Sequence, residues 1–198
     1  AGAGSDDSVH ACCSVQPPMS TTVSVILCSC NRADHLENTL QSLRQVEVPE
    51  DWGTELLLVD NDSTDATPEV MQDFDHPAMR VRVLREEKRG VSNARNHAVS
   101  EARGQVLLFT DDDLRLPPDW IEGMVSPILN EEAEAVAGGV ELAEEVCEDW
   151  MTPHHRSLLA STEQIDPNQP GRIVGANMAI SREVFDKIPG FDPELGPG

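Results

Sequence analysis

Short, mainly apolar runs that recur between helical segments constrain the fold of this chain more than any other feature. Three of them are VSVILCSC at 23–30, ELLLVD at 55–60 and QVLLFT at 105–110. The third is almost wholly apolar, which is typical of a strand covered on both faces in a parallel sheet. Strands that alternate with helices predict right-handed β–α–β units. We therefore expect an α/β fold with a mostly parallel, twisted sheet flanked by helices.

The remaining elements follow from apolar periodicity and from residues that start helices. Leu36, Leu40 and Leu43 share one face of a helical segment, and Thr67 before Pro68 is typical of an N-cap and a first helical position. Helices are expected at residues 33–45, 67–74, 92–103, 119–129 and 182–188, and further strands at 80–84, 135–140 and 172–181.

Two segments lack this periodicity. Residues 1–21 are small and polar and predict a flexible N-terminal tail, so the domain is expected to cover residues 22–198. Residues 144–171 contain several prolines and a His-His pair, which predicts a mobile loop over a site. A chain of 198 residues is long enough for one domain with a substantial core.

The charge and composition of the chain exclude several classes of partner. Its 36 acidic and 14 basic residues give a formal net charge of −22, which disfavours binding to nucleic acid or to an anionic membrane. No apolar stretch approaches the roughly 20 residues that span a bilayer, so membrane association is expected only through parts outside this chain. Five cysteines without CxxC spacing predict neither a zinc cluster nor a disulfide framework. We expect a cytoplasmic protein. If the full-length protein has a membrane anchor, this domain would lie at the inner face of the membrane.

Three consecutive carboxylates, Asp111, Asp112 and Asp113, follow the apolar run at 105–110. Adjacent carboxylates repel one another, and a hard divalent cation such as Mn²⁺ or Mg²⁺ makes such an arrangement favourable. The alternative interpretation is an acidic turn before the segment that starts at Pro117. The triplet by itself does not decide between them.

Polar clusters follow the other two strands at the same position. Cys30-Asn31-Arg32 comes after the first strand and Asp60-Asn61-Asp62 after the second. Because α/β sheets bind ligands at the carboxyl ends of their strands, we expect these clusters and the Asp triplet to converge on one crevice.

Longer motifs connect these clusters to a known family. The segments VSVILCSCNR, ELLLVDNDSTDAT, RGVSNARNHAVSEARGQVLLFTDDD and VGANMAISREVFDKIPGFDPELGPG occur in the order and spacing of inverting family-2 glycosyltransferases, which the chain resembles over residues 22–198. The resemblance implies the GT-A fold of nucleotide-diphospho-sugar transferases. It also implies that a sugar passes with inversion from a nucleotide-diphosphate donor, with a UDP-type donor favoured. The acceptor would be a carbohydrate, lipid-linked or other hydroxyl, and the cation would bind at a DxD-type motif.

Two other functions remain open from the sequence. One is a nucleotide-sugar-binding module without transfer activity. The other is a nucleotidyltransferase that makes sugar nucleotides, which would need a glycine-rich basic loop after the first strand to hold a triphosphate. Residues 30–33 do not supply that loop.

The resemblance also implies roles for individual residues. Asp60 corresponds to an acid that accepts a hydrogen bond from the nucleotide base, and an ionised carboxylate suits a ring N–H such as that of uracil. Asp111 would lie toward the ribose, Asp113 would bind the metal, and Asp112 would share either role. All three acids are therefore candidate metal ligands, and Asp111 and Asp112 are also candidate donor-binding residues.

Further candidates surround these acids. Ser29, Asn31 and Arg32 are expected to border the nucleotide, with Asp62 nearby. An Asx-turn leaving the strand is the alternative for Asp60, and it describes Asp62 and Asp65 better than Asp60. A second set comprises two arginines near the diphosphate, Arg89 and Arg95, and the acceptor-side residues Gly139 and Asn177. An exposed helix arginine paired with Glu101 or a similar acid is the alternative for Arg95, and satisfying buried backbone is the alternative for Asn177.

The catalytic base is not identified within this chain. Family members carry an Asp or Glu just beyond the segment that matches GFDPELGPG, so we expect the base beyond Gly198 and a domain that is C-terminally incomplete. Glu194 lies in the loop that leads up to this position.

Overall fold

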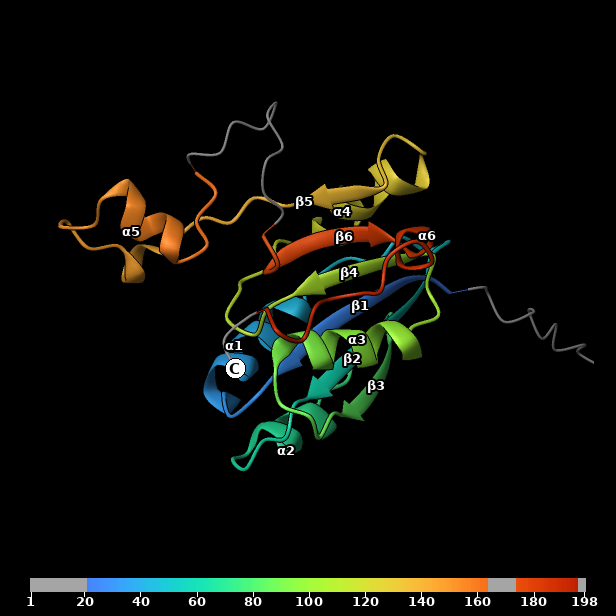
Figure 1. Cartoon of the computed structure of the whole chain (residues 1–198), viewed down its shortest axis with the longest axis horizontal. Helices are drawn as coiled ribbons and strands as arrows, with labels where there is room; N and C mark the ends of the chain where they lie inside the picture. Colours follow the sequence, from blue (N-terminus) through green and yellow to red (C-terminus); the bar gives the residue numbers. More distant parts are fainter. Residues whose placement is uncertain (1–20, 164–173, 196–198) are drawn as a thin grey trace, which may run out of the picture.

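A six-stranded sheet forms the centre of the computed structural model, which describes residues 21–163 and 174–195 (Figure 1). The strand order is β3-β2-β1-β4-β6-β5, in which β6 runs antiparallel to both its neighbours and the pairs among β1 to β4 are parallel. The mostly parallel sheet expected from the sequence is confirmed. The strands are β1 (Thr21–Ser29), β2 (Gly53–Asp60), β3 (Arg80–Arg85), β4 (Val106–Thr110), β5 (Ala135–Ala137) and β6 (Asn177–Ser181).

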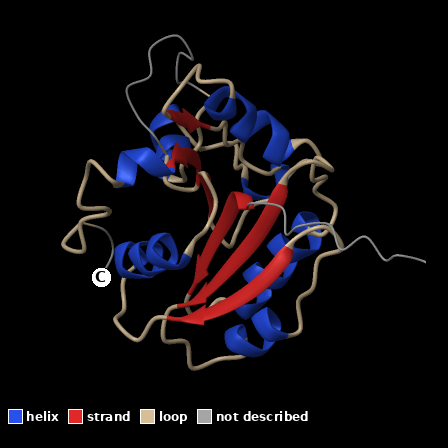
Figure 2. Ribbon diagram, turned by 90° about the vertical axis from the view of Figure 1, so that its right-hand side faces the viewer, coloured by secondary structure: helices blue, strands red, loops and turns tan. Residues whose placement is uncertain are grey.

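Helices cover both faces of the sheet (Figure 2). They are α1 (Ala33–Leu43), α2 (Thr67–Gln72), α3 (Val91–Glu101), α4 (Trp120–Leu129), α5 (Pro153–Leu158) and α6 (Arg182–Phe185), with a 3₁₀ turn η1 (Glu144–Val146). Alternation along β1 explains the two layers, because Val25 packs with α1, α2 and α4 whereas its neighbour Ile26 packs with α3. None of the described helices is long and apolar enough to cross a membrane.

The strand order reverses between β1 and β4, and this reversal marks the place at which the sequence predicts a crevice. The chain runs outward from β1 through β2 to β3, returns by α3, and places β4 on the other side of β1. In open α/β sheets, ligands bind outside the carboxyl ends of the neighbouring strands at such a reversal. The segments after Ser29 and Thr110 therefore border the same opening.

Three local expectations need correction. Thr67 does not cap α2, since Ala66 is the N-cap residue and the Thr67 hydroxyl accepts the Arg32 amide instead. The strand expected at 135–140 ends at Ala137, and Val140 pairs with Thr162 rather than with the sheet. Residues 144–163 are not an irregular loop, because they contain η1 and α5.

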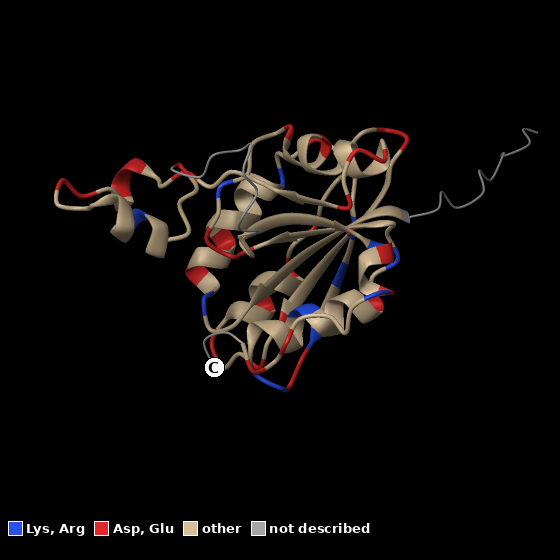
Figure 3. Cartoon of the chain, turned by 45° about the horizontal axis from the view of Figure 1, so that its top comes forward, with Lys and Arg blue, Asp and Glu red and all other residues tan. Residues whose placement is uncertain are grey.

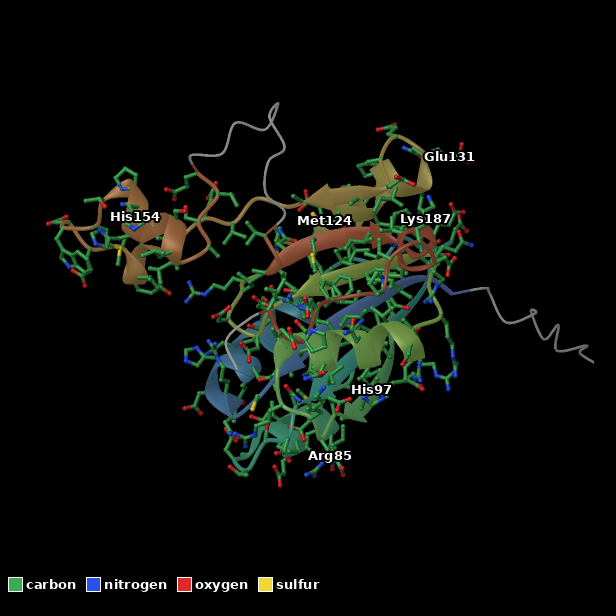
Figure 4. The ribbon with its side chains drawn as sticks, viewed as in Figure 1. Arg85, His97, Met124, Glu131, His154 and Lys187 are labelled. Atoms are coloured by element: carbon green, nitrogen blue, oxygen red, sulfur yellow. The ribbon has the colours of Figure 1, made fainter. Side chains whose placement is uncertain are left out.

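Residues 141–161 form an excursion that begins at Val140 and returns at Thr162, and we call it the α5 excursion. Figure 1 shows it on the side of the sheet where the strands β4 and β5 terminate. Figure 4 shows His154 on it, away from the sheet. Its helix begins with a capping box in which Thr152 and His155 bind each other's backbone. Residues 164–171 of the predicted mobile loop lie outside the described residues.

Gly104 lies between α3 and β4 and shows why a small residue is required there. A Cβ at this position would lie 2.4 Å from the Ser24 backbone nitrogen, and the Gly104 amide donates to Ser24 Oγ at 2.8 Å. We expect Gly104→Ala to lower the free energy of unfolding by about 1–3 kcal/mol, because the backbone of the neighbouring strand would have to move to make room for the methyl group. Urea unfolding followed by circular dichroism measures this.

Gly123 is the matched control for this prediction. It lies inside α4, and nothing stands within 4 Å of a Cβ at its position. Alanine is the better helix former, so Gly123→Ala is expected to stabilise the protein by about 0.5–1 kcal/mol. Equal destabilisation by both changes would contradict the close-approach explanation.

Candidate functional site

The site begins with an ion pair between α3 and the end of β4. Arg95 Nη2 donates to Asp111 Oδ1 at 2.7 Å and to the Gly175 carbonyl at 2.9 Å. The guanidinium also lies 5.7 Å from the Phe191 ring centroid. Arg95 is thus paired with Asp111, not with Glu101, and it joins the Asp triplet to the segment that leads into β6.

Asp112 and Asp113 face the end of β1. Ser29 Oγ donates to Asp112 Oδ2 at 2.5 Å, and Arg32 Nε lies 3.3 Å from Asp112 Oδ1. Arg32 Nη2 donates to Asp113 Oδ2 at 2.8 Å. One guanidinium therefore bridges two neighbouring carboxylates. We call Arg32, Arg95, Asp111, Asp112 and Asp113 the carboxylate–arginine cluster.

The three carboxylates of the triplet do not converge on a common point. In the two described stretches of chain, no three His, Cys, Asp or Glu side chains come together in a way that could hold a metal ion. The physical reason is that Asp111 turns toward Arg95 whereas Asp112 turns toward Ser29, so mutual repulsion is relieved by separate partners. A site built from all three acids is therefore not formed, and their individual roles stay predictions.

Burial changes the pKa of two acids of this cluster. It raises the pKa of Asp111, an effect that the Arg95 guanidinium opposes and the Asp113 carboxylate reinforces. Burial also raises the pKa of Asp112, against the hydrogen bond from Ser29 and the charge of Arg32. Three carboxylates face two guanidinium groups, so the cluster keeps an excess of one negative charge. A further cation beside it would be stabilised.

The turn after β1 is held by the segment after β2. Asn31 adopts a left-handed backbone conformation with φ of 54°, and its Oδ1 accepts the Thr64 amide at 2.7 Å. The Asn31 backbone N–H donates to Ser63 Oγ at 3.0 Å. Asn31 therefore fixes the turn after β1 through both its side chain and its backbone. The sequence did not predict the parts played by Ser63 and Thr64, because both lie more than 30 residues from Asn31.

Asp60 ends β2 as a buried carboxylate at the same edge of the sheet. Its Oδ1 accepts the Ser63 amide at 3.1 Å, so the turn leaving the strand uses one of its oxygens. A carboxylate offers about four acceptor sites, and this bond leaves capacity for a ligand. The turn interpretation and the ligand interpretation are compatible at this residue.

Asn61 is a residue that the sequence interpretation missed. Its Nδ2 donates to the carbonyls of Glu86 and Lys88, and its Oδ1 accepts the Gly90 amide at 2.8 Å. These bonds fix the connection between β3 and α3 against the end of β2. The available signal was its place between two acids at the end of a strand.

The other predicted arginine binds Asp62. Arg89 Nε donates to Asp62 Oδ2 at 3.2 Å, and Arg89 Nη2 donates to the Asp62 carbonyl at 3.0 Å. Arg85, at the end of β3, lies 3.4 Å from Asp62 Oδ1 and is labelled in Figure 4. Asp62 therefore pairs with arginines and makes no Asx-turn, whereas Asp65 makes one by accepting the Thr67 amide. All of the Asp62 pairs are exposed to solvent.

Asn177, which the sequence places among the acceptor-side candidates, is engaged within the fold. Its Oδ1 accepts Trp120 Nε1 at 2.9 Å, and its Nδ2 donates to the Gly139 carbonyl at 3.1 Å. A Cβ on Gly138 would collide with the same side chain. These contacts match the interpretation that Asn177 satisfies buried groups, and they place Gly139 beside it. Direct contact of either residue with a sugar stays a prediction.

The segment after α6 is anchored beside this site by Phe191. Its ring packs edge-on to Phe109 with centroids 5.4 Å apart, and Asn96 holds its backbone through two hydrogen bonds. Ser92 Oγ donates to the Leu195 carbonyl at 3.1 Å, so the described chain reaches the start of α3. The sequence motif contained Phe191 but gave no sign that it supports Arg95.

Acidic residues occur in many parts of the fold (Figure 3), and the 36 acidic residues of the sequence outnumber the 14 basic ones. The cations of the crevice are therefore local exceptions. An anionic ligand would be held there by Arg32, Arg95 and their neighbours rather than by the field of the whole protein.

Comparisons with known proteins agree with this arrangement. A family model described as glycosyl transferase family 2 matches residues 24–189. The glucosyl-dolichyl phosphate glucuronosyltransferase of Haloferax volcanii is 27% identical over 187 residues, which cover 88% of this chain and 57% of that protein. In eight curated relatives the matched segment spans 29% to 57% of the relative's length, so the chain corresponds to part of each.

Solved structures share the fold. The mannosyltransferase PcManGT from Pyrobaculum calidifontis, in complex with GDP-Man and Mn²⁺, has a TM-score of 0.66 at 24% identity, covering 92% of this chain and 51% of that chain. S. aureus TarS 1–349 in complex with UDP-GlcNAc has a TM-score of 0.56 at 22% identity, covering 63% and 36%. Such identities establish the fold alone, and the expected GT-A fold is confirmed.

Proposed function

Because this chain belongs to glycosyl transferase family 2, we propose that it forms the donor-binding part of an enzyme that moves a sugar from a nucleotide-diphosphate donor to an acceptor hydroxyl with inversion. The observation that carries the proposal is the carboxylate–arginine cluster at the point where the strand order reverses. Open α/β sheets bind nucleotides at this point. The cluster combines guanidinium groups, which suit phosphate, with carboxylates, which suit a hard cation.

The donor set fits Mn²⁺ or Mg²⁺. Magnesium is usually bound through one or two carboxylates together with substrate phosphates and waters, so convergence of three acids is not required. Asp113 is half-exposed, and burial raises the pKa of Asp111 and Asp112, so a nearby cation would favour their charged forms. Asp113, together with one of the other two acids, would hold the cation. When bound, the cation neutralises the diphosphate and stabilises the leaving nucleotide.

Asp60 would select the base. Uracil and guanine present a ring N–H that an ionised carboxylate accepts, whereas the matching ring nitrogen of adenine and cytosine is itself an acceptor. The proposal therefore favours UDP-linked or GDP-linked donors. The two structural relatives were solved in complex with GDP-Man and with UDP-GlcNAc, and donors of these two kinds are consistent with the proposal.

The acceptor side and the base of the reaction rest on the family resemblance. The Haloferax volcanii relative is named for a lipid-linked glycoside, and we propose a carbohydrate or lipid-linked hydroxyl as the acceptor here. Gly139 and Asn177, which are hydrogen-bonded to each other, would border that side. The acceptor proton also needs a general base.

Calorimetric titration tests the proposed donor. UDP or GDP is expected to bind in Mn²⁺ more tightly than ADP and CDP. Asp60→Asn is expected to weaken the preferred nucleotide by about 1–3 kcal/mol, because one acceptor oxygen becomes a donor amide. The same change should have little effect on ADP. Failure of all four nucleotides to bind would overturn the proposed function.

A further inference from the structure

Arg32 pairs with Asp112 and Asp113, which are among the acids that would hold the proposed cation. Its Nη2 lies 2.8 Å from Asp113 Oδ2 and its Nε 3.3 Å from Asp112 Oδ1. A bound cation and this guanidinium would compete for the same carboxylate oxygens. Asp112 also accepts a hydrogen bond from Ser29, whereas Asp113 is paired with Arg32.

The side chain of Arg32 is free to change partner while its backbone stays in place. The Arg32 amide donates to Thr67 Oγ1, and the following residue, Ala33, donates to Asp65 Oδ2. These bonds fix the backbone at the start of α1. The side chain, by contrast, is 42% exposed, and its ion-pair partners in the described structure are the carboxylates of Asp112 and Asp113.

A diphosphate gives the guanidinium a competing anion. Arginine forks pair with phosphate oxygens in the same bidentate way as with carboxylates. The negative charge of a diphosphate beside Arg32 would draw the guanidinium away from Asp113, and the freed carboxylate would then be available to the cation.

We propose that Arg32 acts as a latch that determines the order of binding. Its ion pair with Asp113 keeps free divalent cations from binding that acid, and only a diphosphate bound nearby draws Arg32 away and makes Asp113 available to the metal. This inference rests on the proposed function. It predicts that cation and nucleotide bind cooperatively, and thermodynamic linkage requires each to raise the affinity of the other by the same factor. Removing the arginine charge should raise the affinity for the cation alone.

The test measures Mn²⁺ affinity without nucleotide, by electron paramagnetic resonance of free Mn²⁺, in the wild-type chain and in Arg32→Met. An opposite charge within about 4–6 Å shifts the affinity of a carboxylate for a proton by about tenfold or more, and a similar gain is expected for Mn²⁺. Arg32→Lys, which keeps the charge but cannot bridge two acids, should fall between them. Adding Asp113→Asn to Arg32→Met should remove the gain.

Arg44→Met is the matched control. Arg44 follows the last residue of α1, pairs with Asp75 at 3.0 Å and carries the same charge, so its loss changes the net charge equally. Equal Mn²⁺ affinity in Arg32→Met and Arg44→Met overturns the latch.

If wild type binds Mn²⁺ and nucleotide together but Arg32→Met gains no Mn²⁺ affinity, only the latch fails. If wild type binds no nucleotide under any condition, the proposed function fails. Circular dichroism melting shows whether each variant is folded, and Arg32→Lys carries the test if the methionine variant is not.

Discussion

Replacing Glu55 by glutamine is expected to lower the free energy of unfolding by about 3 kcal/mol at neutral pH. The range for breaking a buried ion pair is about 3–5 kcal/mol, and the lower end applies because Arg82 keeps a second partner. Glu55 lies in β2 with its side chain only 3% exposed, and Arg82 Nη1 is 3.1 Å from its Oε2. Urea unfolding followed by circular dichroism gives the value.

The network around Glu55 explains the size of this effect. Its Oε1 accepts Ser24 Oγ at 2.7 Å and the Arg103 amide at 2.7 Å. The carboxylate thus ties β1, β2, β3 and the segment between α3 and β4 together. A glutamine in its place loses the charge and cannot accept all of these donors with both side-chain termini.

The same effect should depend on pH. Burial raises the pKa of Glu55, but the hydrogen bonds from Ser24, Arg103 and Arg82 lower it further than burial raises it, so the pKa lies below its usual value. Stability from such a group is complete above the unfolded pKa, about 4.3, and is lost as the pH falls through the folded pKa. The difference between wild type and Glu55→Gln should therefore shrink below about pH 4.

Glu101→Gln is the control for Glu55. Glu101 also pairs with Arg82, at 2.7 Å, but its side chain is 45% exposed, and its backbone carbonyl binds Arg82 in either case. An exposed pair contributes about 0–1 kcal/mol, so this variant should be close to wild type. Similar losses in the two variants would show that the charge of Arg82, and not the burial of Glu55, determines the result.

The fold was predictable because its signals are local. The apolar runs that form β1, β2 and β4 are continuous in the sequence, and each is buried in the sheet. The helix α5 was missed because it has six residues, too few for periodicity, and its capping box uses His155 where Glu or Gln is usual.

The site was predictable only in part, because its geometry depends on distant partners. The positions of the acids followed from strand ends, so their gathering at one edge could be expected. The pairing of Asp112 with Ser29 spans 83 residues, and that of Trp120 with Asn177 spans 57. No local pattern encodes such contacts. Glu55 shows the same limit, since the sequence suggested an ordinary strand residue where a buried charge meets Ser24, Arg82 and Arg103.

Asp113→Ala is expected to lower the affinity for UDP or GDP in Mn²⁺ by about 100-fold. A metal that bridges protein and phosphate contributes several kcal/mol, and each 1.4 kcal/mol corresponds to a factor of ten. With chelator in place of Mn²⁺ the sign should reverse, because the variant lacks a carboxylate that repels the diphosphate and leaves Arg32 without its 2.8 Å partner. Calorimetry in both conditions measures the two affinities.

Asp75→Ala separates this effect from a general change in charge. Asp75 has a side chain that is 92% exposed and pairs with Arg44, so its loss changes the net charge as Asp113→Ala does. Its nucleotide affinity should match wild type in both conditions. An equal loss of affinity in Asp113→Ala with and without Mn²⁺ would mean that this acid supports the crevice as a structural residue. The half-exposed position of Asp113 argues against that outcome, because nothing in the packed core depends on its side chain.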